Sequence, residues 1–131
     1  MEKTVKFLNE AKVFFISTIN ENKPEVRPFG ALNVFEDKLY FTTSNKKDVF
    51  KQIMANNNIA ISAMNQKGEW IRISAKAIVD QNRDARIAML EANPDLRSMY
   101  NEDDGNFEVF YLENAKSAIY SFTAPKIDET F

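Results

Sequence analysis

The sequence predicts a mainly β domain of the α+β class, an antiparallel barrel of six to seven strands with short helices at its rim. Runs of β-branched and aromatic residues occur in pairs separated by short polar turns, which is typical of hairpins. Eleven Phe, four Tyr and one Trp add to the strand-forming composition. No alternating strand–helix–strand series interrupts this pattern. With 131 residues, the chain is predicted to form a single domain over 1–131.

The first half of the chain contains three predicted strands and two predicted helices. The period of the apolar residues places them as a helix at 3–11, strands at 13–19, 25–35 and 39–43, and a helix at 46–56. Pro28 interrupts the second strand, because proline has no amide N–H to donate to a neighbouring strand. We therefore expect that strand to lie at an edge, or to bulge or end irregularly there.

The second half repeats the hairpin pattern and adds two helices. Strands are expected at 59–64, 70–79, 107–112 and 118–122, and helices at 83–93 and 94–100. A polar loop is expected at 101–106. The residues from 125 to the end are expected to form a tail outside the sheet.

Two residue types are missing altogether, and their absence limits the chemistry. The chain has no Cys and no His. Disulfides, thiol nucleophiles, His-ligated zinc or haem, and triads based on imidazole are therefore excluded. Catalytic side chains remain unidentified and no metal site is expected. Chemistry must come from hydroxyls, carboxylates, Lys, Arg or a bound cofactor.

Charge and hydropathy narrow the possible partners. The formal net charge is −2 and the pI is about 5.2, which argues against nucleic acid as the main partner. The longest apolar run, 13–16, is far too short to cross a membrane. The amino terminus has no signal-peptide core. We expect a cytoplasmic protein.

Two segments carry the strongest signal for a ligand. Residues 26–30 and 41–47 both combine cations with small or hydroxylated residues, at a strand end or a helix start. Such places suit a phosphate, because amide N–H groups and the helix dipole point towards it. The alternative is that these lysines are solvated and that Arg27 forms a cross-strand ion pair. A barrel this small is filled by side chains, so a sizeable ligand must lie on its outer surface.

In order and spacing, these segments resemble the FMN-binding split β-barrel family of pyridoxamine 5'-phosphate oxidase and its smaller relatives, including those related to nitroimidazole resistance. The resemblance covers about residues 3–123. It implies a split barrel, FMN as the cofactor, and a strand segment, an aromatic–Thr pair and a basic pair around it. The residues that match these features are Arg27, Pro28, Phe29, Gly30, Ala31, Phe41, Thr42, Thr43, Lys46 and Lys47.

The resemblance also implies a homodimer with the flavin at the subunit interface. In the family, a later strand reaches the flavin of the other subunit, and 69–75 resembles that strand. Trp70 would then contact the partner's cofactor. The alternative is an ordinary core or interface anchor, which is the more usual role of a single Trp at the start of a strand.

The resemblance implies an FMN-dependent oxidoreductase that acts on a small molecule. Pyridoxamine phosphate itself is not the expected substrate, because the terminal segment 125–131 lacks the Arg and His with which the oxidases hold it. Three alternatives stay open. They are a non-catalytic flavin store or redox sensor, a deazaflavin-dependent reductase, and an interaction module whose lysines are only surface residues.

Overall fold

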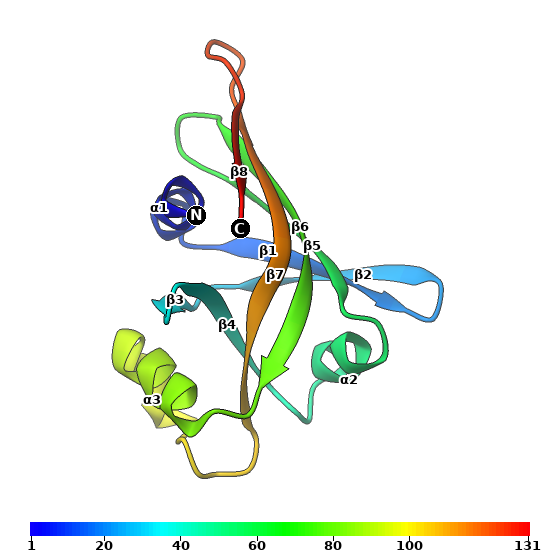
Figure 1. Cartoon of the computed structure of the whole chain (residues 1–131), viewed down its shortest axis with the longest axis vertical. Helices are drawn as coiled ribbons and strands as arrows, with labels where there is room; N and C mark the ends of the chain where they lie inside the picture. Colours follow the sequence, from blue (N-terminus) through cyan, green and yellow to red (C-terminus); the bar gives the residue numbers. More distant parts are fainter.

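The computed structural model describes all residues from 1 to 131, in eight strands, three α-helices and one 3-10 helix (Figure 1). In chain order they are α1 (Glu2–Ala11), β1 (Phe14–Asn20), β2 (Lys23–Phe29), β3 (Leu32–Phe35), β4 (Lys38–Ser44), α2 (Asp48–Ala55), β5 (Asn58–Met64), β6 (Trp70–Asp80), α3 (Arg83–Ala92), η1 (Pro94–Ser98), β7 (Phe107–Tyr120) and β8 (Ile127–Thr130). The predicted α+β class is confirmed, with eight strands in place of six to seven.

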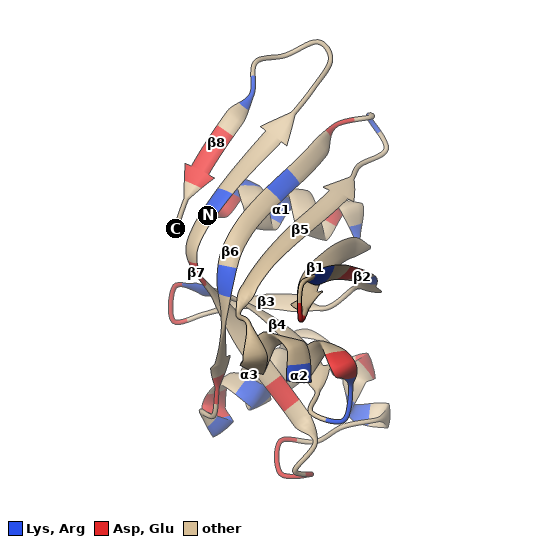
Figure 2. Cartoon of the chain, turned by 90° about the vertical axis from the view of Figure 1, so that its right-hand side faces the viewer, with Lys and Arg blue, Asp and Glu red and all other residues tan.

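The strands form one antiparallel sheet that curves back on itself. Their order is β2-β1-β5-β6-β7-β4-β3, and β8 pairs with β7 outside this path. Only residues 30 and 31 separate β2 from β3, so the two ends of the order are joined by the chain. The result is the expected split barrel. β5 to β8 lie side by side in its upper half, with α1 behind them (Figure 2).

Alternating burial along the strands builds the main core. In β5, Ile59, Ile61 and Ala63 are buried, while the residues between them are exposed. Phe7 and Leu8 of α1 cover this inner face. Full burial of an aliphatic or aromatic side chain of this size stabilises the fold by about 1.5–3 kcal/mol. A second, smaller cluster packs α3 against β4 and β7.

The expected strand 25–35 is in fact two strands. β2 ends at Phe29 and β3 begins at Leu32. Pro28 pairs with Phe15 and lies in β2, the strand at the edge of the sheet, where a proline is tolerated. The chain then turns through Gly30 and Ala31 into β3 on the other side of the barrel opening.

The end of the chain was wrongly predicted in two respects. The strands expected at 107–112 and 118–122 are one continuous strand, β7, which bends at Asn114 where φ is 54°. The pairing of β7 with β6 continues past this point through a shift in register between Ser74 and Lys76. The expected tail forms β8, which pairs with β7 from Lys116–Thr130 to Ile119–Ile127.

Glu129 fastens β8 to the start of α1. Its Oε1 accepts hydrogen bonds from the Thr4 amide at 2.8 Å and the Thr4 hydroxyl at 2.7 Å. Its Oε2 accepts from the Lys3 amide at 3.1 Å and lies 3.3 Å from the ammonium of Met1. Burial alone would raise the pKa of Glu129, but these donors outweigh it and lower the pKa to about 2. The carboxylate thus caps the helix, where anions are favoured.

We expect Glu129→Gln to lower the free energy of unfolding at pH 6 by on the order of 2 kcal/mol, since bonds to a charged group are lost. The folded-state pKa of Glu129 is below its usual value of 4.5. The carboxylate therefore stabilises the fold fully above about pH 4.5, and this contribution disappears as the pH falls towards about 2. Urea unfolding of both proteins between pH 6 and pH 3 measures the difference.

The matched control is Glu91→Gln, which removes an exposed carboxylate on α3 and should change stability by less than about 0.5 kcal/mol. A gap between wild type and Glu129→Gln that stays constant down to pH 3 would contradict the assignment.

None of the helices has the length and hydrophobicity needed to cross a membrane.

Candidate functional site

A pocket of about 560 Å³ lies at the lower rim of the barrel, between the β2–β3 link, the end of β4, and η1. This volume is within the usual range for small-molecule sites, about 300–1,000 Å³. We call it the rim pocket. Eight of the residues implied by the family resemblance line it, and these are Arg27, Pro28, Phe29, Gly30, Ala31, Thr42, Thr43 and Lys47.

Three of the residues implied by the resemblance lie elsewhere. Phe41 is fully buried in the core and packs edge-on against Phe14, with ring centroids 5.2 Å apart. Lys46 is exposed next to Lys47 but does not line the pocket. Trp70 lies on the other side of the barrel, at the start of β6. The chain thus brings most, but not all, of the expected residues together in one subunit.

A polar network fixes the position of Arg27. Its Nη1 donates to the Thr18 hydroxyl at 2.6 Å and its Nη2 donates to Oε1 of Gln52 at 3.0 Å. Nη2 also lies 3.8 Å from the carboxylate of Glu25. Burial lowers the pKa of Arg27, and the charge of Glu25 opposes this. Because the side chain is only 24% exposed and is bonded to Thr18 and Gln52, its charge is held in a fixed position.

The two threonines of β4 differ in what they can offer a ligand. The Thr42 hydroxyl donates to the backbone carbonyl of Glu108 at 2.8 Å, so only its lone pairs remain available. Thr43 is 6% exposed and lines the rim pocket, and its hydroxyl forms no hydrogen bond within the chain. A hydroxyl can donate and accept. Thr43 is therefore the better placed of the two to bind a polar ligand edge.

The start of α2 supplies the remaining positive charge. Lys46 and Lys47 are exposed in the turn after β4, and the helix begins at Asp48, two residues later than expected. The first turn of a helix leaves amide N–H groups without intrahelical partners, and these attract anions. The carboxylate of Asp48 opposes this attraction. Lys46 and Lys47 place two positive charges beside it.

The sequence analysis did not predict the wall of the rim pocket that lies opposite β2. It consists of residues from the end of α3 to just beyond η1, namely Ala92, Asn93, Pro94, Asp95, Leu96, Met99 and Tyr100. The Asn93 side chain donates to the backbone carbonyl of Leu32 at 3.1 Å, which joins this wall to β3. Pro94 in the sequence indicates the start of a helix. No local pattern indicates that the residue before it, Asn93, contacts β3 at Leu32, 61 residues earlier in the chain.

A second concavity, of about 640 Å³, lies on the face of the sheet that no helix covers. We call it the sheet groove. It includes Trp70, whose ring stacks on Tyr120 with centroids 5.5 Å apart and planes 13° apart. Phe15 and Val26 are 46% and 65% exposed on the same face. The sheet groove and the rim pocket have no lining residue in common.

No group of three Asp or Glu side chains is arranged to hold a metal ion.

Comparison with known proteins identifies the class that this fold and pocket define. The family model of pyridoxamine 5'-phosphate oxidase matches residues 1–118. The chain therefore belongs to the pyridoxamine 5'-phosphate oxidase-like split-barrel family.

Solved structures give more specific similarities. A NimC/NimA family protein from Clostridium acetobutylicum is 39% identical, with a TM-score of 0.98, over 100% of this chain and 92% of that one. A pyridoxamine 5'-phosphate oxidase-related, FMN-binding protein from Nostoc punctiforme is similar in fold, with 17% identity, a TM-score of 0.67, and coverage of 96% and 90%. General stress protein 26 from Bacillus anthracis also shares the fold, with 15% identity, a TM-score of 0.74, and coverage of 98% and 97%. A search of curated protein sequences gives no match.

Proposed function

We propose that the protein binds FMN in the rim pocket and acts as a flavin-dependent oxidoreductase on a small molecule. The observation that carries this proposal is the pocket itself. It combines a fixed Arg27, the exposed Lys47 and the unbonded hydroxyl of Thr43 along one continuous surface. The FMN-binding protein from Nostoc punctiforme, which has the same fold, supports the choice of cofactor.

Each part of the pocket has a role in this proposal. Arg27 and Lys47, which line the pocket, hold the phosphate together with Lys46, which is exposed beside Lys47 just outside it. Each charge-assisted hydrogen bond to the phosphate contributes about 1.5–3 kcal/mol. The backbone from Pro28 to Ala31 borders the flavin ring, and Thr42 and Thr43 bond its polar edge. The flavin supplies the electron transfer, whereas the protein sets its orientation and its access to substrate.

We further propose a homodimer that forms through the uncovered sheet face. That face exposes Phe15 and Val26 beside the small residues Ser17 and Ala60, so a second sheet can approach closely. A stable interface of standard size buries about 800 Å² per partner. In such a dimer, Trp70 contacts the flavin bound to the partner subunit rather than the flavin bound to its own chain. Its separation from the rim pocket of its own chain is consistent with this role.

A catalytic role is distinguished from flavin storage or redox sensing by reoxidation. The FMN-loaded protein is reduced without oxygen and mixed with a quinone or a nitroaromatic compound. An oxidoreductase reoxidises much faster than free reduced FMN at the same concentration. Reoxidation no faster than that of free reduced FMN would instead support a non-catalytic flavin store or redox sensor. A parallel titration with a deazaflavin tests whether the protein binds that cofactor in place of FMN.

The pH dependence of that reoxidation rate tests the source of protons. The chain has no His, so no side chain with an ordinary pKa near neutrality is available. Protons must then come from water or from the substrate. We expect the rate to show no ionisation step between about pH 6 and pH 8 other than those that free reduced FMN shows with the same acceptor. A sharp additional step in that range would contradict this part of the proposal.

A further inference from the structure

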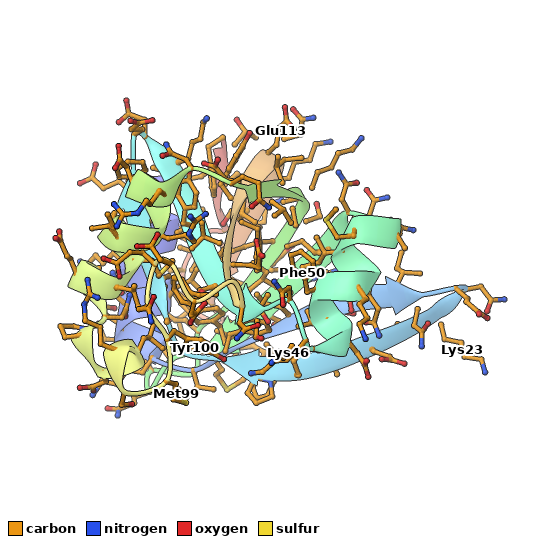
Figure 3. The ribbon with its side chains drawn as sticks, turned by 90° about the horizontal axis from the view of Figure 1, so that it is seen from below. Lys23, Lys46, Phe50, Met99, Tyr100 and Glu113 are labelled. Atoms are coloured by element: carbon orange, nitrogen blue, oxygen red, sulfur yellow. The ribbon has the colours of Figure 1, made fainter.

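The two sides of the rim pocket differ in chemistry, and this difference bears on the substrate. The cations that line the pocket, Arg27 and Lys47, are on the side of β2 and the start of α2. The η1 side contributes Met99, Tyr100 and the carboxylate of Asp95. Figure 3 shows this separation, with Lys46 near α2 and Met99 and Tyr100 on the opposite side, below α3.

The η1 side is held rigidly. The Tyr100 amide donates to the carbonyl of Leu96 at 2.9 Å, and its ring packs on Phe107 with centroids 5.2 Å apart. The loop that follows is fixed by the bidentate pair of Arg83 with Asp103, at 2.8 Å for both contacts. This wall is therefore a preformed part of the pocket.

Two side chains of this wall, Met99 and Tyr100, keep apolar surface or a hydroxyl group available for a ligand. Met99 is 67% exposed although it lines a pocket, and a thioether packs well against aromatic rings. The hydroxyl of Tyr100 forms no hydrogen bond within the chain and can donate one to a ligand. Arg97, the cation on η1, lies 3.1 Å from Glu102 and does not line the pocket. Asp95 is thus the charged side chain on this wall.

We infer that the η1 side of the rim pocket is the substrate subsite, and that it selects a planar aromatic compound that is uncharged or cationic over an anionic one. Met99 covers the aromatic ring, Tyr100 donates a hydrogen bond to a polar atom of the substrate, and Asp95 repels negative charge. This inference rests on the proposed binding of FMN in the other part of the same pocket.

The test measures dead-end binding to the FMN-loaded protein in its oxidised state, where no turnover occurs. The probes are 1,4-naphthoquinone, which is neutral, and 1,4-naphthoquinone-2-sulfonate, which has the same ring system and a negative charge. Perturbation of the flavin absorption spectrum reports the dissociation constant. We expect the neutral probe to bind about tenfold more tightly, and Asp95→Asn to reduce this preference several-fold.

Two further variants test the wall without changing charge. Met99→Ala should weaken binding of the neutral probe about tenfold, and Met99→Leu should restore most of it. Tyr100→Phe keeps the ring that packs on Phe107 and should weaken the same probe several-fold through the lost hydrogen bond. The control is Met54→Ala, since Met54 is 63% exposed on α2 and does not line the rim pocket.

The outcomes separate this inference from the proposed function. If no FMN binds, the proposed function fails and the inference fails with it. The inference alone fails if FMN binds but the sulfonate binds as tightly as the neutral probe. It also fails if Asp95→Asn leaves the preference unchanged, or if Met99→Ala affects binding no more than Met54→Ala does.

Discussion

Reversing the charge of Lys46 and Lys47 together, by Lys46→Glu and Lys47→Glu, weakens FMN binding by at least about a hundredfold. Each charge-assisted hydrogen bond to a phosphate contributes about 1.5–3 kcal/mol, and about 1.4 kcal/mol corresponds to a factor of ten. Two such bonds are lost and two repulsions are added. Asp48, which begins α2, increases the repulsion. Calorimetric titration with FMN measures the change.

The control for this variant is a second double variant that changes the net charge by the same amount at lysines outside the rim pocket. Lys23 lies at the start of β2, well away from Lys46 (Figure 3), and Lys67 is exposed in the turn between β5 and β6. Lys23→Glu with Lys67→Glu should change FMN affinity less than about threefold, because exposed charges beyond about 10 Å are screened by salt. Riboflavin, which has no phosphate, should bind the charge-reversed and wild-type proteins equally. Equal FMN affinity in all three proteins would leave Lys46 and Lys47 as surface residues only.

Replacing Phe41 by Ala destabilises the fold by about 3–5 kcal/mol, the usual cost of removing a buried Phe ring. The Phe41 ring is fully buried, with its centroid 5.2 Å from that of Phe14 and 5.8 Å from that of Phe110. A domain of this kind has a total stability of only about 5–15 kcal/mol. Urea unfolding of the protein without FMN therefore shows a large loss in the free energy of unfolding. Thermal unfolding shows a fall in melting temperature of roughly 10–20 °C.

The control for Phe41→Ala is Phe122→Ala, since Phe122 is 88% exposed and its loss should cost less than about 1 kcal/mol. The comparison also tests why the family pattern has an aromatic residue at position 41. Unchanged stability together with lost FMN affinity would make Phe41 a ligand contact. A large loss of stability makes it the core residue that supports Thr42 and Thr43.

The sequence predicts those parts of the fold that depend on local pattern. The period of the apolar residues places α1, α2, α3 and the hairpin of β5 and β6 within a few residues of their observed bounds. It does not place β8, because this four-residue strand contains a single apolar residue, Ile127, and therefore has no strand-like apolar pattern, although it pairs with the neighbouring β7. Glu129 is held by Thr4, 125 residues earlier. Nothing near position 129 in the sequence indicates this contact.

The candidate site likewise has one part that could be predicted from the sequence and one part that could not. The segments around Arg27 and Thr43 could be found because each is continuous in sequence and matches a family pattern. The wall that contains Met99 and Tyr100 could not, because it reaches the site through the packing of α3 on β3 and the bond from Asn93 to Leu32. The resemblance predicts that Trp70 contacts the flavin of a second subunit, and within its own chain Trp70 lies in the sheet groove, apart from the rim pocket.

Titration of the purified protein with FMN, followed by both flavin absorption and Trp70 fluorescence, tests the central claim most directly. The account predicts saturable binding of about one FMN per chain with micromolar or tighter affinity, together with quenching of this single Trp. A protein that shows no change in flavin absorption, no quenching and no FMN-dependent rise in melting temperature would contradict it.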